Sequence, residues 1–188
     1  MKFALALITS IALAAVVAAA DLYRHVPSGL DCLPEIAGFT LQTVYEDEKA
    51  YPGHGVTCAY VAPQYGAHIQ IFNEKLPSVP ADINHPAFVQ LHDRTLRDIE
   101  RTAQSHNETA RLMDHAVLNV DTARGPIPVY YDAYVVESPK LGTRTEWAWL
   151  WTSRNHFVKI RMTRVGTGSL SPRRAREFFD AVVRLAAE

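Results

Sequence analysis

Two histidines and a carboxylate, His85, His92 and Asp93, lie close together in the middle of the sequence. Imidazole and carboxylate groups are common zinc ligands, and a helix could bring two histidines seven residues apart to one side. Pro86, however, favours a helix that begins after His85 and leaves His85 outside it. Because no HExxH motif accompanies these residues, we predict no metal site and no cofactor.

Serine-based catalytic motifs are missing from the sequence, which contains neither G-x-S-x-G nor S-x-x-K. We therefore predict no catalytic residue. A hydrolase whose active-site groups meet only in the folded chain is the alternative. It requires a cleft in which His68 or His92 lies within hydrogen-bond reach of a carboxylate and a hydroxyl group.

A candidate binding face follows from the alternation of three predicted strands, residues 127–136, 145–152 and 157–163. One side of them carries two tyrosines, two carboxylates and two cations, which we call the tyrosine face: Tyr130, Asp132, Tyr134, Glu146, Lys159 and Arg161. Such a face could bind a polar ligand or a protein partner. The interpretation that we favour is a solvated sheet face with cross-strand ion pairs, because antiparallel sheets often have one such face.

The opposite side of these strands is apolar and predicts their register. With a tight turn at Arg154 and Asn155, the expected pairs are Trp151 with Val158, Trp149 with Ile160, and Trp147 with Met162. In the preceding hairpin we expect Val135 beside Trp147, Ala133 beside Trp149, and Tyr131 beside Trp151. The tryptophans therefore belong to the core.

The remaining elements lie on both sides of a long helix, predicted from Pro86 to about Met113 with a stripe at Phe88, His92, Leu96, Ile99 and Ala103. The alternative is a break in this helix around Ser105-His106-Asn107. Strands are expected at 38–45, 56–61, 67–72 and 116–120, and a closing helix begins at Ser171-Pro172. A four-residue loop at 63–66 would pair Tyr60 with Ile69 and Cys58 with Ile71. The fold class is α+β: an antiparallel sheet of about six to seven strands, with the long middle helix and the C-terminal helix packed on it.

Short strings in this layout resemble the PsbP/Mog1-like group. They are Gly38-Phe39-Thr40 at the first strand, Tyr51-Pro52 before the second, and Gly66-Ala67 before Ile69, Ile71 and Phe72. Gly53-His54-Gly55 stands where relatives often have a tryptophan. The resemblance implies a sandwich with helices against the sheet, and a group whose members mostly bind or assist other proteins. No catalytic residue is carried over.

The first twenty residues have the pattern of a signal peptide: Lys2, an apolar run over residues 3–17, and small residues at 18–20. An uncleaved anchor is the alternative, but the run is alanine-rich and short for a spanning helix. We expect export to the periplasm or beyond, with a single α+β domain at 21–188 and no stable membrane insertion after cleavage. In an oxidising compartment Cys32 and Cys58 are expected to form a disulfide.

The charge balance of the chain argues against nucleic acid as a partner. The chain has 19 basic and 20 acidic residues and a formal net charge of −1, which does not favour nucleic acid. The sequence thus favours an exported, non-enzymatic binding or accessory protein that takes a protein partner or a small polar ligand. An exported hydrolase with a dispersed site and a structural envelope component are the alternatives.

Overall fold

The structure is a computed structural model that describes residues 23–25, 28–166 and 172–187. The predicted signal peptide lies outside the described residues. Short N-terminal strands β1 (Tyr23–His25), β2 (Leu30–Cys32) and β3 (Glu35–Ile36) precede β4 (Phe39–Tyr45) and the single-turn helix α1 (Asp47–Ala50). The hairpin β5 (Val56–Ala62) and β6 (Tyr65–Phe72) leads to helix α2 (Pro86–Ser105). Four long strands follow, β7 (Thr109–Thr122), β8 (Gly125–Ser138), β9 (Gly142–Ser153) and β10 (His156–Val165), and then helix α3 (Arg173–Ala187).

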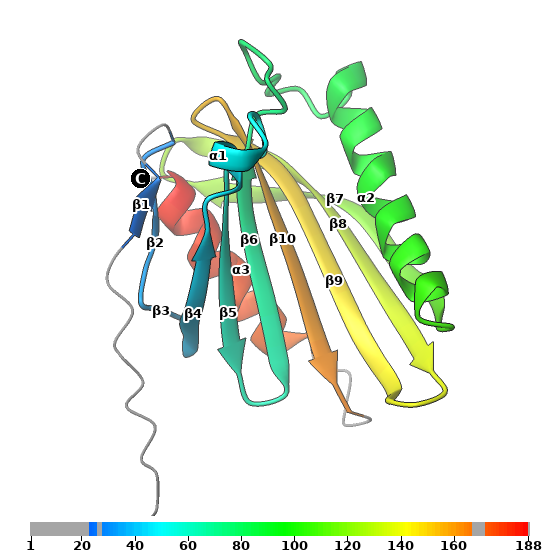
Figure 1. Cartoon of the computed structure of the whole chain (residues 1–188). Helices are drawn as coiled ribbons and strands as arrows, with labels where there is room; N and C mark the ends of the chain where they lie inside the picture. Colours follow the sequence, from blue (N-terminus) through cyan, green and yellow to red (C-terminus); the bar gives the residue numbers. More distant parts are fainter. Residues whose placement is uncertain (1–22, 26–27, 167–171, 188) are drawn as a thin grey trace, which may run out of the picture.

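The central element is an eight-stranded antiparallel sheet in the order β3-β4-β5-β6-β10-β9-β8-β7. Figure 1 shows α2 on one side of this sheet and α3 on the other. The predicted α+β class and antiparallel sheet are therefore confirmed. The predicted count of six to seven strands is too low, because the short β3 adds an eighth strand to the main sheet.

The tryptophan side of the sheet forms the main core under α3. Trp147, Trp149 and Trp151 are buried and share one cluster with Phe178 and Phe179 of the helix. The ring of Trp149 stacks on that of Phe179 at a centroid distance of 5.2 Å. The pairs predicted between β9 and β10 are confirmed: Trp151 with Val158, Trp149 with Ile160, and Trp147 with Met162.

Two other predicted hairpin registers are wrong by two residues. The β5–β6 turn is shorter than expected, so Cys58 pairs with Ile69 and Tyr60 with Ala67. Likewise, Tyr131 pairs with Trp149 and Ala133 with Trp147, one pair away from the prediction. Because side chains in a strand alternate with a period of two, these shifts leave every side chain on its predicted face.

Helix α2 has 20 residues and ends at Ser105, so the extension of the helix to about Met113 is wrong, whereas the alternative of a break around residues 105–107 is confirmed. Asn107 adopts a positive φ of 57°, and the next amide, of Glu108, donates to the carbonyl of Ala103. This is a Schellman-type helix end, with asparagine in the left-handed position usually held by glycine. The chain then reverses into β7, whose first residues, up to about Met113, lie in the stretch that we predicted to be helical.

Cys32 of β2 and Cys58 of β5 are joined in a disulfide, with their Cα atoms 6.0 Å apart. Both residues belong to the buried cluster under α3. The bond thus connects the irregular N-terminal segment to the core side of the sheet. In the described part of the chain, no helix combines the length and the apolar character needed to cross a membrane.

Candidate functional site

The tyrosine face lies under α2. The strand registers place its six residues on one side of the sheet, as predicted: Tyr130, Asp132, Tyr134, Glu146, Lys159 and Arg161. The face is not an open sheet surface, because Asp132, Tyr134 and Glu146 are 1%, 1% and 6% exposed. Its residues separate into three groups: a groove around Lys159, an ion-pair network around Glu146, and a histidine–carboxylate cluster around Asp132.

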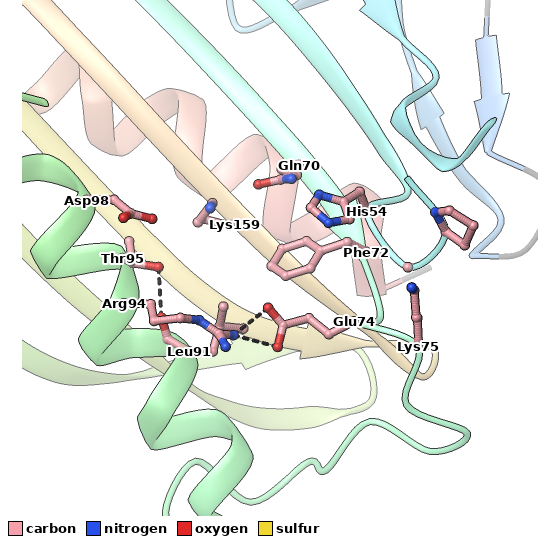
Figure 2. Close-up of a pocket in the computed structure, with 12 residues that line it drawn as sticks. His54, Gln70, Phe72, Glu74, Lys75, Leu91, Arg94, Thr95, Asp98 and Lys159 are labelled. Atoms are coloured by element: carbon pink, nitrogen blue, oxygen red, sulfur yellow. Dashed lines mark hydrogen bonds and ion pairs between the residues drawn. The ribbon is translucent and has the colours of Figure 1, made fainter. Parts of the chain in front are cut away.

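The groove lies between α2 and the strands β6 and β10, and we call it the α2 groove (Figure 2). Its volume is about 440 Å³. The sheet contributes Gln70, Phe72 and Lys159, and α2 contributes Arg94, Thr95 and Asp98. The loops around His54 and Lys75 line one end. Its polar and charged lining suits a polar ligand better than an apolar one.

Lys159 is the half-buried cation of this groove. Its Nζ atom lies 5.4 Å from the centre of the Phe72 ring. Burial beneath α2, together with the nearby Arg161 guanidinium, lowers the pKa of Lys159 to about 8. Among the described residues, no carboxylate lies within ion-pair distance of this ammonium group.

Several other charges along the groove have ion-pair partners, and the carboxylates of Asp98 and Glu74 also attract the Lys159 ammonium group from beyond ion-pair distance. Arg94 of α2 forms an ion pair with Glu74, which Figure 2 shows at the lower edge of the groove. Asp98 lies 3.6 Å from Arg101, one turn along the same helix. Lys159 is therefore the half-buried charge that this groove leaves for a ligand of opposite sign.

The second group is an ion-pair network at the other end of α2. Arg144 of β9 lies 2.7 Å from a carboxylate oxygen of Glu108 and 3.0 Å from one of Glu146. Glu146 also accepts a hydrogen bond of 3.0 Å from Arg161 of β10. Because each carboxylate in this network has a guanidinium partner, we interpret it as structural support for the strands and the α2 end.

The third group is a histidine–carboxylate cluster made of His92, His115 and Asp132, from α2, β7 and β8. The Nε2 atom of His92 lies 2.8 Å from Oδ2 of Asp132, and the Nδ1 atom of His115 lies 2.7 Å from Oδ1. The Tyr130 ring stacks on the His92 ring, with a centroid distance of 4.0 Å and an interplanar angle of 6°. One potential ligand atom from each of the three residues lies within 4.8 Å of the others.

A bulge in β7 brings His115 into this cluster. The pairing with β8 shifts between Leu112 and Asp114, after which His115 pairs with Asp132. Bulges insert one residue into a strand and redirect the side chains that follow. The sequence-based prediction missed His115, because it placed the region before residue 116 outside any strand.

The histidines considered for metal binding or hydrolysis are not brought together. His85 caps α2 by accepting a hydrogen bond from the amide of Ala87, and Asp93 is exposed. His68 is exposed on β6 and has no ion-pair partner among the described residues. His92 does meet a carboxylate, but within the described ranges no hydroxyl group is hydrogen-bonded to His92 or His115. The hydroxyl nucleophile required by the hydrolase hypothesis is therefore not in place.

Comparison with known proteins identifies a similar fold. No family model and no curated protein sequence match the chain. Among solved structures, cyanobacterial PsbP (CyanoP) from Synechocystis sp. PCC 6803 is similar, with a TM-score of 0.53 and 16% identity over 90% of this chain and 92% of that chain. The chain therefore has a PsbP-like fold, as the short sequence strings predicted.

Proposed function

We propose that this chain is an exported, non-enzymatic binding or accessory protein. Its α2 groove would receive an anionic group, such as a carboxylate or a phosphate, of a small polar ligand or a protein partner. The observation that carries this proposal is the position of Lys159 in the groove, without a carboxylate partner among the described residues. Burying an ammonium group without a counter-charge is unfavourable, and an anionic ligand would remove part of that cost.

The form of the groove supports a binding role. Its floor is a rigid part of the sheet, because Lys159 lies on β10 between its neighbours β6 and β9. Thr95 donates its hydroxyl hydrogen to the carbonyl of Leu91, and Gln70 lies close to Lys159 along the floor (Figure 2). The amide of Gln70 could therefore add a neutral hydrogen bond to a ligand held by Lys159.

Export is part of the same proposal. It is supported by the signal-peptide pattern of residues 1–20 and by a disulfide between two buried cysteines. Periplasm and extracellular space are both compatible with these features. Fractionation of cells that produce the full chain would test this, and recovery of the uncleaved chain in the cytosol would contradict export.

The proposed site predicts anion binding that depends on Lys159. We expect a panel of small carboxylates and phosphates, beginning with citrate and inorganic phosphate, to contain a compound that binds saturably. In ¹H–¹⁵N NMR spectra its shift changes should centre on Gln70, Thr95 and Lys159. The Lys159→Met variant should bind at least about tenfold more weakly, because a charge-assisted hydrogen bond contributes about 1.5–3 kcal/mol.

Lys140→Met is the matched control, because Lys140 is an exposed lysine in the β8–β9 turn and lies outside the groove. It should bind as the unmodified protein does. Equal affinity in the Lys159→Met variant, or no saturable binding to any compound of the panel, would contradict the proposed site.

Binding should also weaken as the pH rises. Lys159 carries its charge below its pKa of about 8 and loses it above that value. With a ligand whose own charge is constant in this range, affinity should stay level to about pH 7 and fall by about tenfold per unit well above pH 8. Because a bound anion raises the pKa of the amine, the decline begins near the pKa of the free protein and levels off near the higher pKa of the complex. Titration calorimetry at several pH values measures this, and an affinity that rises with pH would exclude Lys159 as the binding cation.

A further inference from the structure

We propose that His92, His115 and Asp132 form a binding site for a divalent transition-metal ion of the zinc class. The three residues come from α2, β7 and β8, so only the folded chain assembles them. Each imidazole directs one nitrogen at a different oxygen of the same carboxylate, at 2.8 Å and 2.7 Å. Two imidazole nitrogens and one carboxylate are a ligand set that zinc proteins use with one position left open.

The charge of the cluster favours a cation. Asp132 is 1% exposed, and its ion-pair partners among the described residues are the two histidines, which are charged only when protonated. With both rings neutral, the cluster holds a buried negative charge. A buried carboxylate is unfavourable unless it is paired or coordinates a metal. A divalent ion would replace the shared protons and compensate this charge.

The surroundings of the cluster provide two properties of a metal-binding site, an ordered ligand and access from solvent. The Tyr130 ring packs flat against the ring of His92 and fixes its orientation. The side chain of His115 is 46% exposed, and it lies on β7, the last strand of the sheet. A metal ion could therefore enter from the β7 edge, and its fourth position would face water or an anion there.

The small adjustment needed for metal binding falls on the exposed side. The possible ligand atoms lie within 4.8 Å of one another, whereas atoms that share a zinc ion at 2.0–2.2 Å lie about 3.3 Å apart. His115 follows the β7 bulge and is only partly covered, so its ring can move without disturbing the core. His92 and Asp132 are buried and are held by their mutual hydrogen bond and by the stacked Tyr130 ring, so these two ligands are already ordered.

The test uses the full purified protein freed of metal with a chelator, titrated with ZnCl₂ by calorimetry. We expect one Zn²⁺ per chain, and visible d–d absorption bands of tetrahedral Co²⁺ when Co²⁺ is added instead. His115→Gln removes the half-exposed ligand without opening the core and should weaken Zn²⁺ binding by at least about tenfold. It should also abolish the tetrahedral Co²⁺ bands.

His68→Gln is the matched control, because His68 is an exposed histidine on the same side of the sheet but on β6. It should leave the zinc affinity and the Co²⁺ spectrum unchanged. Circular dichroism spectra of both variants verify that they fold. Absence of stoichiometric zinc binding in the unmodified protein, or equal binding in the His115→Gln variant, would overturn the proposal and leave the cluster as a hydrogen-bonded structural element.

Discussion

Replacing Phe88 with alanine is expected to lower the free energy of unfolding by about 3–5 kcal/mol. Phe88 is fully buried on the inner side of α2. Its ring lies 5.6 Å from that of Tyr130 and 5.7 Å from that of Phe157, in the cluster that joins α2 to the sheet. The substitution removes these contacts and leaves a cavity that the rigid sheet cannot fill. Chemical denaturation followed by circular dichroism measures the change.

The same substitution should loosen α2 before it affects the tryptophan side of the sheet. The cluster that contains Phe88 is separate from the core under α3, so most of the lost packing contacts are those that hold α2 on the sheet. Hydrogen exchange of α2 amides should accelerate more than that of β9 and β10 amides. Gln90→Ala, at an exposed position of the same helix, should stay within about 0.5 kcal/mol of the unmodified protein. A loss below about 1 kcal/mol for Phe88→Ala would show that this contact does not hold α2 in place.

The helix stripe illustrates what the sequence could predict. Of the five expected inward positions of α2, four are buried, namely Phe88, His92, Ile99 and Ala103, and Leu96 is partly buried. A histidine in an apolar stripe was itself a signal, because a buried imidazole needs a polar partner. The sequence could not identify that partner as Asp132, since the two residues are 40 positions apart and meet only when α2 lies on β8.

Strand alternation predicted faces more securely than it predicted registers. The registers of two hairpins are wrong by two residues, yet the six residues of the tyrosine face share one side, as expected. Strand alternation predicts which side chains lie on the same face of the sheet, but it does not predict which helix or loop packs on that face. The burial of Asp132 and Glu146 under α2 depends on how the helix packs, and no local pattern encodes that packing.

His115 was missed for a local reason. The sequence allowed a helix end around residues 105–107 but did not decide for it, because Asn107 takes the left-handed position there and no glycine or proline marks the end. The bulge after Leu112 then interrupts the period-two pattern that would have placed His115 on the α2 side. Two irregularities within a few residues therefore concealed one member of the histidine–carboxylate cluster.

The second large effect concerns the disulfide. Reducing the bond between Cys32 and Cys58 should lower the free energy of unfolding by about 3.5 kcal/mol, because the bond closes a loop with a sequence separation of 26. For a domain of this size the melting temperature should fall by roughly 10 °C. Thermal unfolding with and without dithiothreitol compares the melting temperatures of the reduced and the oxidised protein without any substitution. Free thiols in the protein as purified under non-reducing conditions, or superimposable unfolding curves, would contradict the prediction.

The bond should matter most at the β4 edge of the sheet. The loop that it closes contains β3, β4 and α1, and β3 pairs with β4 over only two residue pairs. Cys32 and Ile36 nevertheless belong to the core under α3, so release of this segment would expose part of that core to water. A Cys32→Ala/Cys58→Ala variant should therefore show faster hydrogen exchange in β4 as well as lower overall stability. The β8–β9 hairpin, at the far side of the sheet, should keep its protection until global unfolding, which separates loss of the bond from a general weakening of the fold.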